Sequence, residues 1–499
     1  MLSPADPRVV MGFYFSPRGG SAQVARYLCR ALHEGPWAPT LFTGSLAGGI
    51  GDAAEFFCDL DTNVLDYSPA RAAWEQGADP MNVDVPMHAS FEDKHGVPDR
   101  IFVALDDLAY RRQVRSWTRF LASNGTDPPD VLHLHHLTPI HEAARRLWPG
   151  IPVITHLHGT ELKMLESLHT HTQTHTNVAP ASQWTTQWVS RFERWARDSA
   201  RIVVVSATDA ATVRRLLPVE AQRIVTIANG VDTGAFAPGP PASSSARRAL
   251  WSRLLADDPQ GWKPGGAPGS IRYDASALDA FNDGVGGPIP VILYTGRFMK
   301  FKRLQLLIEA HHVRRTAGGP RSVLVIAGGY PGEWEGEHPF DTVERLGAED
   351  VFFVGWHGHD VLAEMLGCSD VFAAPSVDEP FGLVYLEAMA AGLPPIATAT
   401  GGPLSFINTD AEEPTGWLVA PDDVGALTDA LTEAVVDATG RRARGRRAAR
   451  FVHANYAWTS TAIHFADLYR DVIAESDATK RMKPLRPTAS IGERRGVRT

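Results

Sequence analysis

The stretch that decides the fold is VFAAPSVDEPFGLVYLEAMAAG, residues 371 to 392. It begins with a short apolar run typical of a buried strand, and residues 383 to 391 have the composition and length of a helix. Phe381 and Gly382 stand between the two and predict a strand-to-helix turn. A strand, a turn and a helix in this order form the repeating unit of a parallel sheet covered by helices.

The same unit recurs along almost the whole chain. Earlier apolar runs, each followed by a stretch with helical spacing, lie at Val9–Phe15, Asp130–His135, Pro152–Leu157 and Arg201–Ser206. The pattern restarts at Val291–Phe298 and continues into the stretch quoted above. It predicts an α/β protein with two doubly wound domains that face each other across a cleft. Ligands of such sheets bind beyond the carboxyl ends of the strands, so we expect the site in that cleft.

A stretch rich in proline, glycine and serine interrupts the pattern. We therefore place an N-terminal domain at residues 1–237, a linker or insertion at 238–290 and a C-terminal domain at 291–457. Tryptophan and tyrosine residues in the middle segment favour an ordered insertion over a loose tether. A last amphipathic helix is expected at 458–477, followed by a basic, disordered tail at 478–499.

The composition is that of a globular protein of the cytoplasm. The chain has 499 residues and a formal net charge of -9, which disfavours a nucleic-acid partner. Its three cysteines are scattered and lack ligand spacing, which favours a reducing compartment. The first residues lack the basic region of a signal peptide, and no apolar run approaches the roughly 20 residues of a membrane span. The oligomeric state stays undetermined at this level.

Two turns of the C-terminal domain carry groups suited to a diphosphate. Gly382 allows a ligand to approach the backbone, and the first amides of the following helix lack internal partners. Upstream, GRFMKFKRLQLL (Gly296–Leu307) leaves a strand and carries Arg297 and Lys302 before another helix. Fixed cations and helix-start amides complement the roughly two negative charges of a diphosphate.

Glu379 and Glu387 flank the first of these turns. An acid repels phosphate, but an ionised carboxylate only accepts hydrogen bonds and therefore suits the hydroxyl groups of sugars. We predict that the two acids hold a nucleotide diphosphate-sugar, with Glu379 at the transferred sugar and Glu387 at the ribose. Taken singly, each acid is better explained by the helix dipole and each cation by solvation, so the prediction depends on their combination.

These motifs resemble the donor-site signature of the family 4 retaining glycosyltransferases, which have the GT-B fold of two Rossmann-like domains. The resemblance covers most of the chain, since SPRGGS, HGTEL, NGVDTGAF and GGP also stand in the expected order. It implies that Arg297 and Lys302 bind the donor diphosphate, and that the final helix can cross back to the N-terminal domain. It also implies a hexosyltransferase that retains the anomeric configuration.

The resemblance completes the predicted site from both sides of the cleft. His158, directly before Gly159, is implied to face the transferred sugar near its anomeric carbon, and Gly19 and Gly20 to give backbone access to the diphosphate. A structural histidine and an ordinary turn are the alternatives for these residues. The predicted catalytic residues are thus His158, Arg297, Lys302 and Glu379. The predicted donor-binding residues are Gly19, Gly20, Gly296, Phe381, Gly382, Leu383 and Glu387.

Other polar motifs are assigned to the acceptor side or to chance. His133–His136 is expected to line the acceptor side, and His156 is less favoured than His158 as the histidine at the sugar. HTHTQTHT (His169–Thr176) lacks the spacing of a metal site and predicts a polar acceptor-side loop. Asp59-Leu60-Asp61 is attributed to chance. We expect no metal and no cofactor, because cations and amides can neutralise the leaving diphosphate.

Two other functions stay open. A nucleotide-sugar epimerase of related fold would convert the donor sugar without an acceptor, and a non-catalytic nucleotide-sugar sensor would bind the donor without turnover. The basic helix AYRRQVRSWTRFLAS (Ala109–Ser123) allows contact with a membrane surface, although a solvated helix with buried aromatic residues is preferred. The insertion and the His/Thr segment point to a small polar or specialised-metabolite acceptor. The nucleotide base, the sugar and the acceptor itself are not determined.

Overall fold

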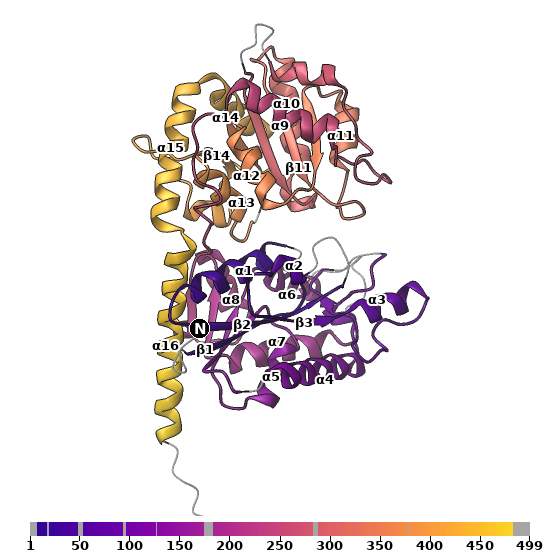
Figure 1. Ribbon diagram of the computed structural model, residues 1–499, viewed down its shortest axis with the longest axis vertical. Coiled ribbons are helices and arrows are strands. Elements are labelled where there is room, and N and C mark those ends of the chain that lie inside the picture. Colours follow the sequence, from indigo (N-terminus) through magenta and orange to yellow (C-terminus); the bar gives the residue numbers. More distant parts are fainter. Residues whose placement is uncertain are drawn as a thin grey trace, which may run out of the picture.

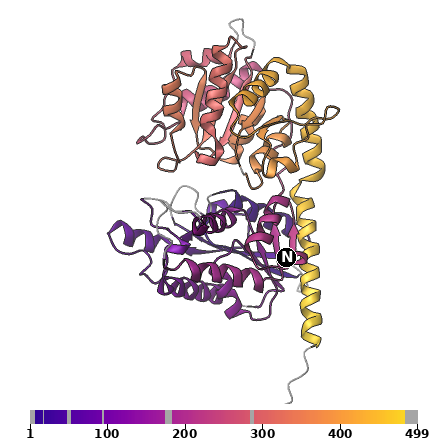
Figure 2. The same cartoon turned by 180° about the vertical axis from the view of Figure 1, so that it is seen from behind.

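The computed structural model describes residues 7–16, 19–47, 53–92, 96–125, 127–173, 183–282, 288–377 and 379–482. The chain forms two α/β domains, one above the other in Figure 1, and two successive C-terminal helices run along one side, one beside each domain. The view from behind shows the same arrangement (Figure 2). The predicted pair of doubly wound domains is therefore confirmed.

The N-terminal domain is built on a seven-stranded sheet in the order β3-β2-β1-β6-β7-β8-β9, and all its pairings are parallel. Its strands are β1 (Arg8–Phe13), β2 (Ala38–Ser45), β3 (Thr62–Asp66), β6 (Val131–His135), β7 (Val153–His156), β8 (Arg201–Val204) and β9 (Ile224–Thr226). Its α-helices are α1 (Gly20–His33), α2 (Ala53–Phe56), α3 (Ser68–Glu75), α4 (Asp107–Asn124), α5 (Ile140–Leu147), α6 (Thr160–Gln173), α7 (Thr185–Asp198) and α8 (Ala207–Leu216). A small separate ladder joins β4 (Ala89–Ser90) and β5 (Arg100–Ile101).

The C-terminal domain has a six-stranded parallel sheet in the order β12-β11-β10-β13-β14-β15. Its strands are β10 (Val291–Gly296), β11 (Val323–Gly328), β12 (Val351–Gly355), β13 (Val371–Ala374), β14 (Pro395–Thr398) and β15 (Trp417–Val419). Its α-helices are α10 (Leu304–Thr316), α11 (Pro339–Leu346), α12 (His359–Gly367), α13 (Leu383–Ala390), α14 (Val424–Val436) and α15 (Ala438–Asn455). The strand order reverses direction between β10 and β13, and a ligand crevice is expected at such a point.

The expected linker is largely ordered and packs on the C-terminal domain. It contains α9 (Ser244–Ser252), a π-helical turn at Arg253–Asp257 and a 3₁₀ segment at Ala275–Phe281. Trp251, Leu255 and Trp262 lie in the same apolar core as the C-terminal sheet. Much of this segment therefore belongs physically to the C-terminal domain, because its aromatic side chains are buried there.

The last helix, α16 (Trp458–Met482), crosses back to the N-terminal domain, as expected. Phe465 and Tyr469 share a buried core with Met11 of β1 and Leu28 of α1. The helix continues five residues beyond the expected end at 477, and Lys480 pairs with Asp477 one turn earlier at 3.5 Å. The rest of the expected tail, residues 483–499, lies outside the described residues.

The basic helix α4 has its aromatic residues in the core. The exposed fractions of the Tyr110 and Trp117 side chains are 8% and 1%, which fits the preferred solvated helix. Among the described residues, no helix combines the length and apolar character that a membrane span requires.

Shortening a side chain of α16 that is buried against the N-terminal domain should destabilise the protein. Phe465 is 1% exposed, so Phe465→Ala should lower the free energy of unfolding by about 3–5 kcal/mol, because a cavity replaces the ring. Ile463 lies on the same helix but is 61% exposed, so Ile463→Ala should change the free energy of unfolding by less than about 0.5 kcal/mol. Denaturant unfolding of both variants checks this, and equal effects would contradict the packing described.

Candidate active site

The basic loop predicted from the sequence begins where β10 ends. Arg297 is exposed, and its guanidinium lies 3.6 Å from the Glu92 carboxylate of the N-terminal domain. The loop is held by Arg303, which has a left-handed backbone (φ 52°) and donates two hydrogen bonds to Asp422 at 2.6 and 3.2 Å. Sequence reasoning missed Arg303, although it stands directly beside Lys302. It keeps the loop in place while Arg297 reaches the opposite domain.

Lys302 and Glu379 form a buried ion pair. The Nζ atom of Lys302 lies 2.5 Å from Oε2 of Glu379, and the two side chains are 13% and 10% exposed. Burial opposes ionisation of Glu379, but the charges of Lys302 and then Lys163 outweigh it and lower the pKa of the carboxyl. The cation predicted to bind phosphate and the acid predicted to bind sugar therefore neutralise each other in this structure.

Lys163 reaches this pair from the N-terminal domain. It belongs to α6, and its ammonium lies 3.9 Å from the centroid of the Phe301 ring. The Lys302 ammonium lies 5.0 Å from the centroid of the same ring. Two cations from different domains thus converge beside Glu379. Lys163 directly follows the HGTEL motif, and its chain position alone carried no sign that it faces Glu379.

The turn between β13 and α13 requires glycine. Gly382 has φ 94°, and a Cβ atom there would lie 2.6 Å from Tyr385 and 3.2 Å from Glu379. The GGP motif supports the same turn, because the Gly402 amide donates to the Glu379 carbonyl at 2.8 Å. The Phe381 side chain is buried against Phe406, with ring centroids 5.7 Å apart, which leaves its backbone as the part suited to a ligand.

The N-terminal glycine turns face this turn across the domain boundary. A Cβ atom at Gly20 would lie 3.6 Å from Leu383, and one at Gly159 would lie 2.7 Å from Pro380. Gly19 is exposed, with φ 93°, at the start of α1. The predicted contribution of both domains to one site is therefore consistent with this geometry. Pro17 and Arg18 of the same motif lie outside the described residues.

Glu387 lies on α13 and is 7% exposed. Burial raises the pKa of its carboxyl, and the nearby His359 partly offsets the rise. The Nε2 atom of His359 lies 3.6 Å from Oε1 of Glu387, and its Nδ1 atom lies 3.4 Å from the Tyr27 hydroxyl of α1. Sequence reasoning missed His359. Its position just beyond the carboxyl end of β12, in WHGHD, was the available signal.

His158 follows β7 and is partly exposed. Its Nε2 atom lies 2.9 Å from Nδ1 of His135, and its amide donates to Glu161 at 3.2 Å. The other Glu161 oxygen lies 3.0 Å from Nδ1 of His136. Burial, followed by the neighbouring imidazoles of His136, His135 and His133, lowers the pKa of His158 well below its usual value. The ring is therefore neutral at neutral pH.

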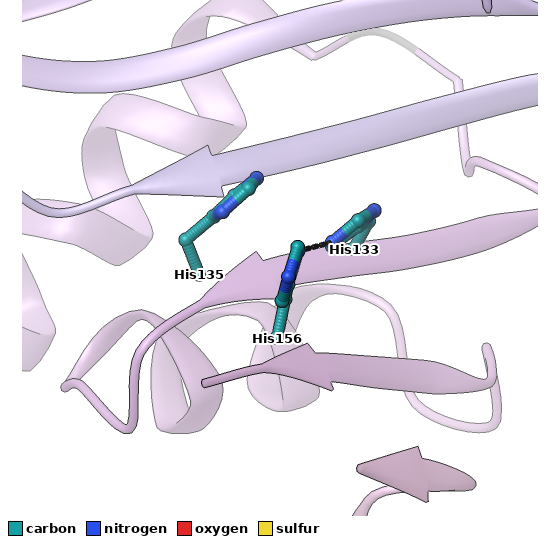
Figure 3. A group of neighbouring side chains, drawn as sticks. All are labelled: His133, His135 and His156. Atoms are coloured by element: carbon teal, nitrogen blue, oxygen red, sulfur yellow. Dashed lines mark hydrogen bonds between the residues drawn. The ribbon is translucent and has the colours of Figure 1, made fainter. Parts of the chain in front are cut away.

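His133, His135 and His156 form an interior group, shown in Figure 3. All three are fully buried, and Leu134 and His136 are buried too, so the expectation that His133–His136 lines the acceptor side is wrong. His133 and His135 face inward because alternate residues of β6 point to the core that α16 covers. His133 contacts Tyr469 (Nδ1 to hydroxyl, 2.5 Å) and His156 (Nε2 to Nδ1, 3.3 Å).

One ring nitrogen from each of these three histidines lies within 4.8 Å of the other two, a spacing that a metal ion could use. The expectation of no metal stays a prediction. The described part of HTHTQTHT, residues 169–173, continues helix α6, so the predicted loop is wrong there; residues 174–176 lie outside the described residues. Asp59 pairs with Arg30 at 2.8 Å, and Asp61 accepts a hydrogen bond from Thr40 at 2.7 Å. Both acids of the Asp-x-Asp motif thus have structural partners.

Comparison with known proteins accounts for both domains. A family model described as Glycosyltransferase Family 4 matches residues 18–235, and one described as Glycosyl transferases group 1 matches residues 282–451. The chain belongs to the GT4-type glycosyltransferases. The predicted family and enzyme class are confirmed.

Curated relatives of this glycosyltransferase include two D-inositol 3-phosphate glycosyltransferases. The protein of Saccharomonospora viridis is 28% identical over 356 residues, which cover 69% of this chain and 70% of that protein. The protein of Stackebrandtia nassauensis is 28% identical over 408 residues, which cover 78% and 80% of the two chains.

Solved structures confirm the GT-B fold. Sucrose-phosphate synthase from Thermosynechococcus elongatus superimposes with a TM-score of 0.61 at 21% identity, and the match covers 94% of this chain and all of that one. Anabaena Alr3699/HepE in complex with UDP-glucose gives a TM-score of 0.58 at 16% identity, over 94% and 99% of the chains.

The effects of Lys302 and Glu379 on the free energy of unfolding should be strongly coupled. Lys302→Met leaves a carboxylate buried without its partner, so it should lower the free energy of unfolding by about 3–5 kcal/mol. The double variant Lys302→Met/Glu379→Gln should be less destabilised than Lys302→Met alone, because no charge is left unpaired. Denaturant unfolding measures both.

The control for these two variants is Arg253, which pairs with Glu364 at 2.7 Å on the surface of the same domain. Arg253→Met should cost at most about 1 kcal/mol, because the pair is exposed to solvent. The coupling would be contradicted if the double variant Lys302→Met/Glu379→Gln were as destabilised as Lys302→Met alone, or more so.

Proposed function

We propose that this glycosyltransferase transfers a hexose-type sugar from a nucleotide diphosphate-sugar to an acceptor hydroxyl, with retention of the anomeric configuration. One observation carries the proposal. Lys302 and Lys163 converge on the buried Glu379 carboxylate at the turn before α13, Arg297 extends from the same loop as Lys302, and the glycine turns of the other domain face that turn.

Arg297 and Lys302 are proposed to hold the diphosphate. Both side chains extend from the loop after β10. The hydroxyl of Tyr294, on that strand, donates to the Arg297 carbonyl at 3.1 Å. A diphosphate entering beside Lys302 would compete with Glu379 for the ammonium group. The arginine fork and the unpaired helix amides would complete the oxyanion site. The UDP-glucose complex of the structural neighbour HepE makes a UDP-sugar the first donor to test.

Glu379 is proposed to accept hydrogen bonds from hydroxyls of the transferred sugar, and Glu387 from those of the ribose. The lowered pKa of Glu379 keeps it ionised, and therefore an acceptor, at neutral pH. His158 is proposed to face the sugar from the N-terminal domain. Gly159 lies close to Pro380, so His158, which directly precedes Gly159, is near the turn that carries Glu379.

The proposed chemistry takes place on one face of the sugar. The bond from the anomeric carbon to the phosphate oxygen breaks, and a bond to the acceptor oxygen forms on the same side. The acceptor proton passes to the departing phosphate oxygen, which leaves on the nucleoside diphosphate. Arg297, Lys302 and the α13 amides stabilise the charge that develops there, so the proposed reaction requires no metal.

The acceptor is proposed to be a small polar molecule. The curated relatives are named for D-inositol 3-phosphate, and a structural neighbour is a sucrose-phosphate synthase. These names favour a phosphorylated polyol or sugar among the first acceptors to test. Release of nucleoside diphosphate that depends on the acceptor would separate this function from that of an epimerase or a sensor.

Arg297→Ala should lower the transfer rate by about 10²–10³-fold, because it removes a preorganised cation from the leaving group. Lys300→Ala is the matched control, since Lys300 is an exposed cation of the same loop, and should retain the wild-type rate. Release of UDP from UDP-glucose in the presence of inositol phosphate or a hexose phosphate measures both. An undiminished rate in Arg297→Ala would refute the assignment.

Donor affinity should depend on pH through Glu387. Its pKa is raised, so the free enzyme carries a proton there at a higher pH than an ordinary glutamate does. Ribose needs the ionised acceptor, so binding should release that proton, and affinity should weaken as pH falls through the raised pKa. Calorimetric titration with UDP-glucose from about pH 7.5 to pH 5 measures this dependence.

Two variants test the source of this pH dependence. Glu387→Gln should bind UDP-glucose more weakly and lose the dependence. His359→Gln removes a neighbouring titratable group and should retain the pH dependence, moved to higher pH because His359 lowers the pKa of Glu387. An unchanged dependence in Glu387→Gln would contradict the role of Glu387.

A further inference from the structure

We propose that His135 is a positioning residue that holds His158 in a single neutral tautomer, with the proton on Nδ1. His158 then acts on the sugar as a hydrogen-bond donor and not as a general base. The inference rests on the proposed function, because it specifies how one residue of that site acts.

The two imidazoles meet edge to edge. Nδ1 of His135 lies 2.9 Å from Nε2 of His158, and the ring planes differ by only 9°. The ring centroids are 5.2 Å apart, which is the separation expected when two nearly coplanar rings share one proton along an in-plane N–H···N bond. The sheet register places the two rings together. His135 ends β6 and pairs with His156 of β7, and His158 follows His156 by two residues.

The buried surroundings decide which nitrogen of His135 carries the proton. His135 is fully buried, and its Nε2 atom has no hydrogen-bond partner among the described residues. A proton on Nε2 would leave a donor unsatisfied in the interior, and buried N–H groups without a partner are the rarer and costlier case. The proton therefore lies on Nδ1 and is donated to Nε2 of His158.

The tautomer of His158 follows from this bond. Burial, together with the neighbouring imidazoles, keeps the pKa of both rings well below the usual value, so each is neutral and carries one proton. With Nε2 of His158 accepting from His135, its own proton is on Nδ1. Since His158 is partly exposed, Nδ1 is the nitrogen left for a ligand, and it can only donate.

The interior group in Figure 3 does not need a metal ion to hold this pair. His133 already uses both ring nitrogens, one toward Tyr469 at 2.5 Å and one toward His156 at 3.3 Å. A metal ion shared by the three rings would have to displace the contact with His156. The tautomer of His158 should therefore be the same before and after treatment of the protein with a chelator.

Nitrogen NMR of the full-length protein labelled with ¹⁵N-histidine tests the inference without any substrate. The His158 ring, assigned with His158→Gln, should show a protonated Nδ1 and an unprotonated Nε2. A protonated Nε2, or a tautomer that changes on chelation, would overturn the inference. A protein that turned over no sugar nucleotide would refute the proposed function, yet this measurement would still decide the tautomer.

Two substitutions connect the tautomer to the reaction. His135→Asn places an amide N–H near the position of Nδ1, so it should keep the His158 tautomer and most of the rate of UDP release from UDP-glucose. His135→Leu removes the donor, so it should mix the tautomers. It should also lower kcat by about 10- to 100-fold, with a much smaller change in KM for the donor.

Thermal unfolding shows whether each variant is folded. Equal losses in the Asn and Leu variants, or an unchanged tautomer in His135→Leu, would overturn the positioning role.

Discussion

The site depends on one constraint, the passage of α16 from the C-terminal domain onto the N-terminal one. Phe465 and Tyr469 of this helix are buried with β1 and α1, and Leu383 of α13 packs against the same core from the C-terminal domain. This attachment brings the loop after β10 to Glu92 and the turn before α13 to Gly20 and Gly159. Without it, each domain would present half of a site.

The titratable groups at this boundary lie in pairs. Arg297 faces Glu92, Lys302 faces Glu379, and Glu387 faces His359. Such pairs hold side chains in position while they offset the cost of burying charge. A nucleotide diphosphate-sugar carries both the anionic groups and the hydroxyls that could take over these contacts.

Four histidines on or just after β6 and β7 fall into two layers. His133, His135 and His156 lie in the interior between the sheet and α16, whereas His158 is partly exposed beyond the end of β7. Period-two alternation along β6 predicts that His133 and His135 share a face of the sheet. It does not say whether that face meets solvent or another element. Here α16 covers it, which is why the acceptor-side prediction for these residues was wrong.

The sequence by itself determined the class of fold, the two domains and the donor-site motifs, because these depend on local periodicity and on residue types at turns. Gly382, for example, has to be glycine for reasons contained within a few residues of it. Only the tertiary structure decided the partners: Arg297 with Glu92, Lys163 with Phe301, His359 with Glu387 and His135 with His158. These contacts join segments far apart in the chain, and their geometry depends on sheet register and domain packing, which no spacing in the sequence records.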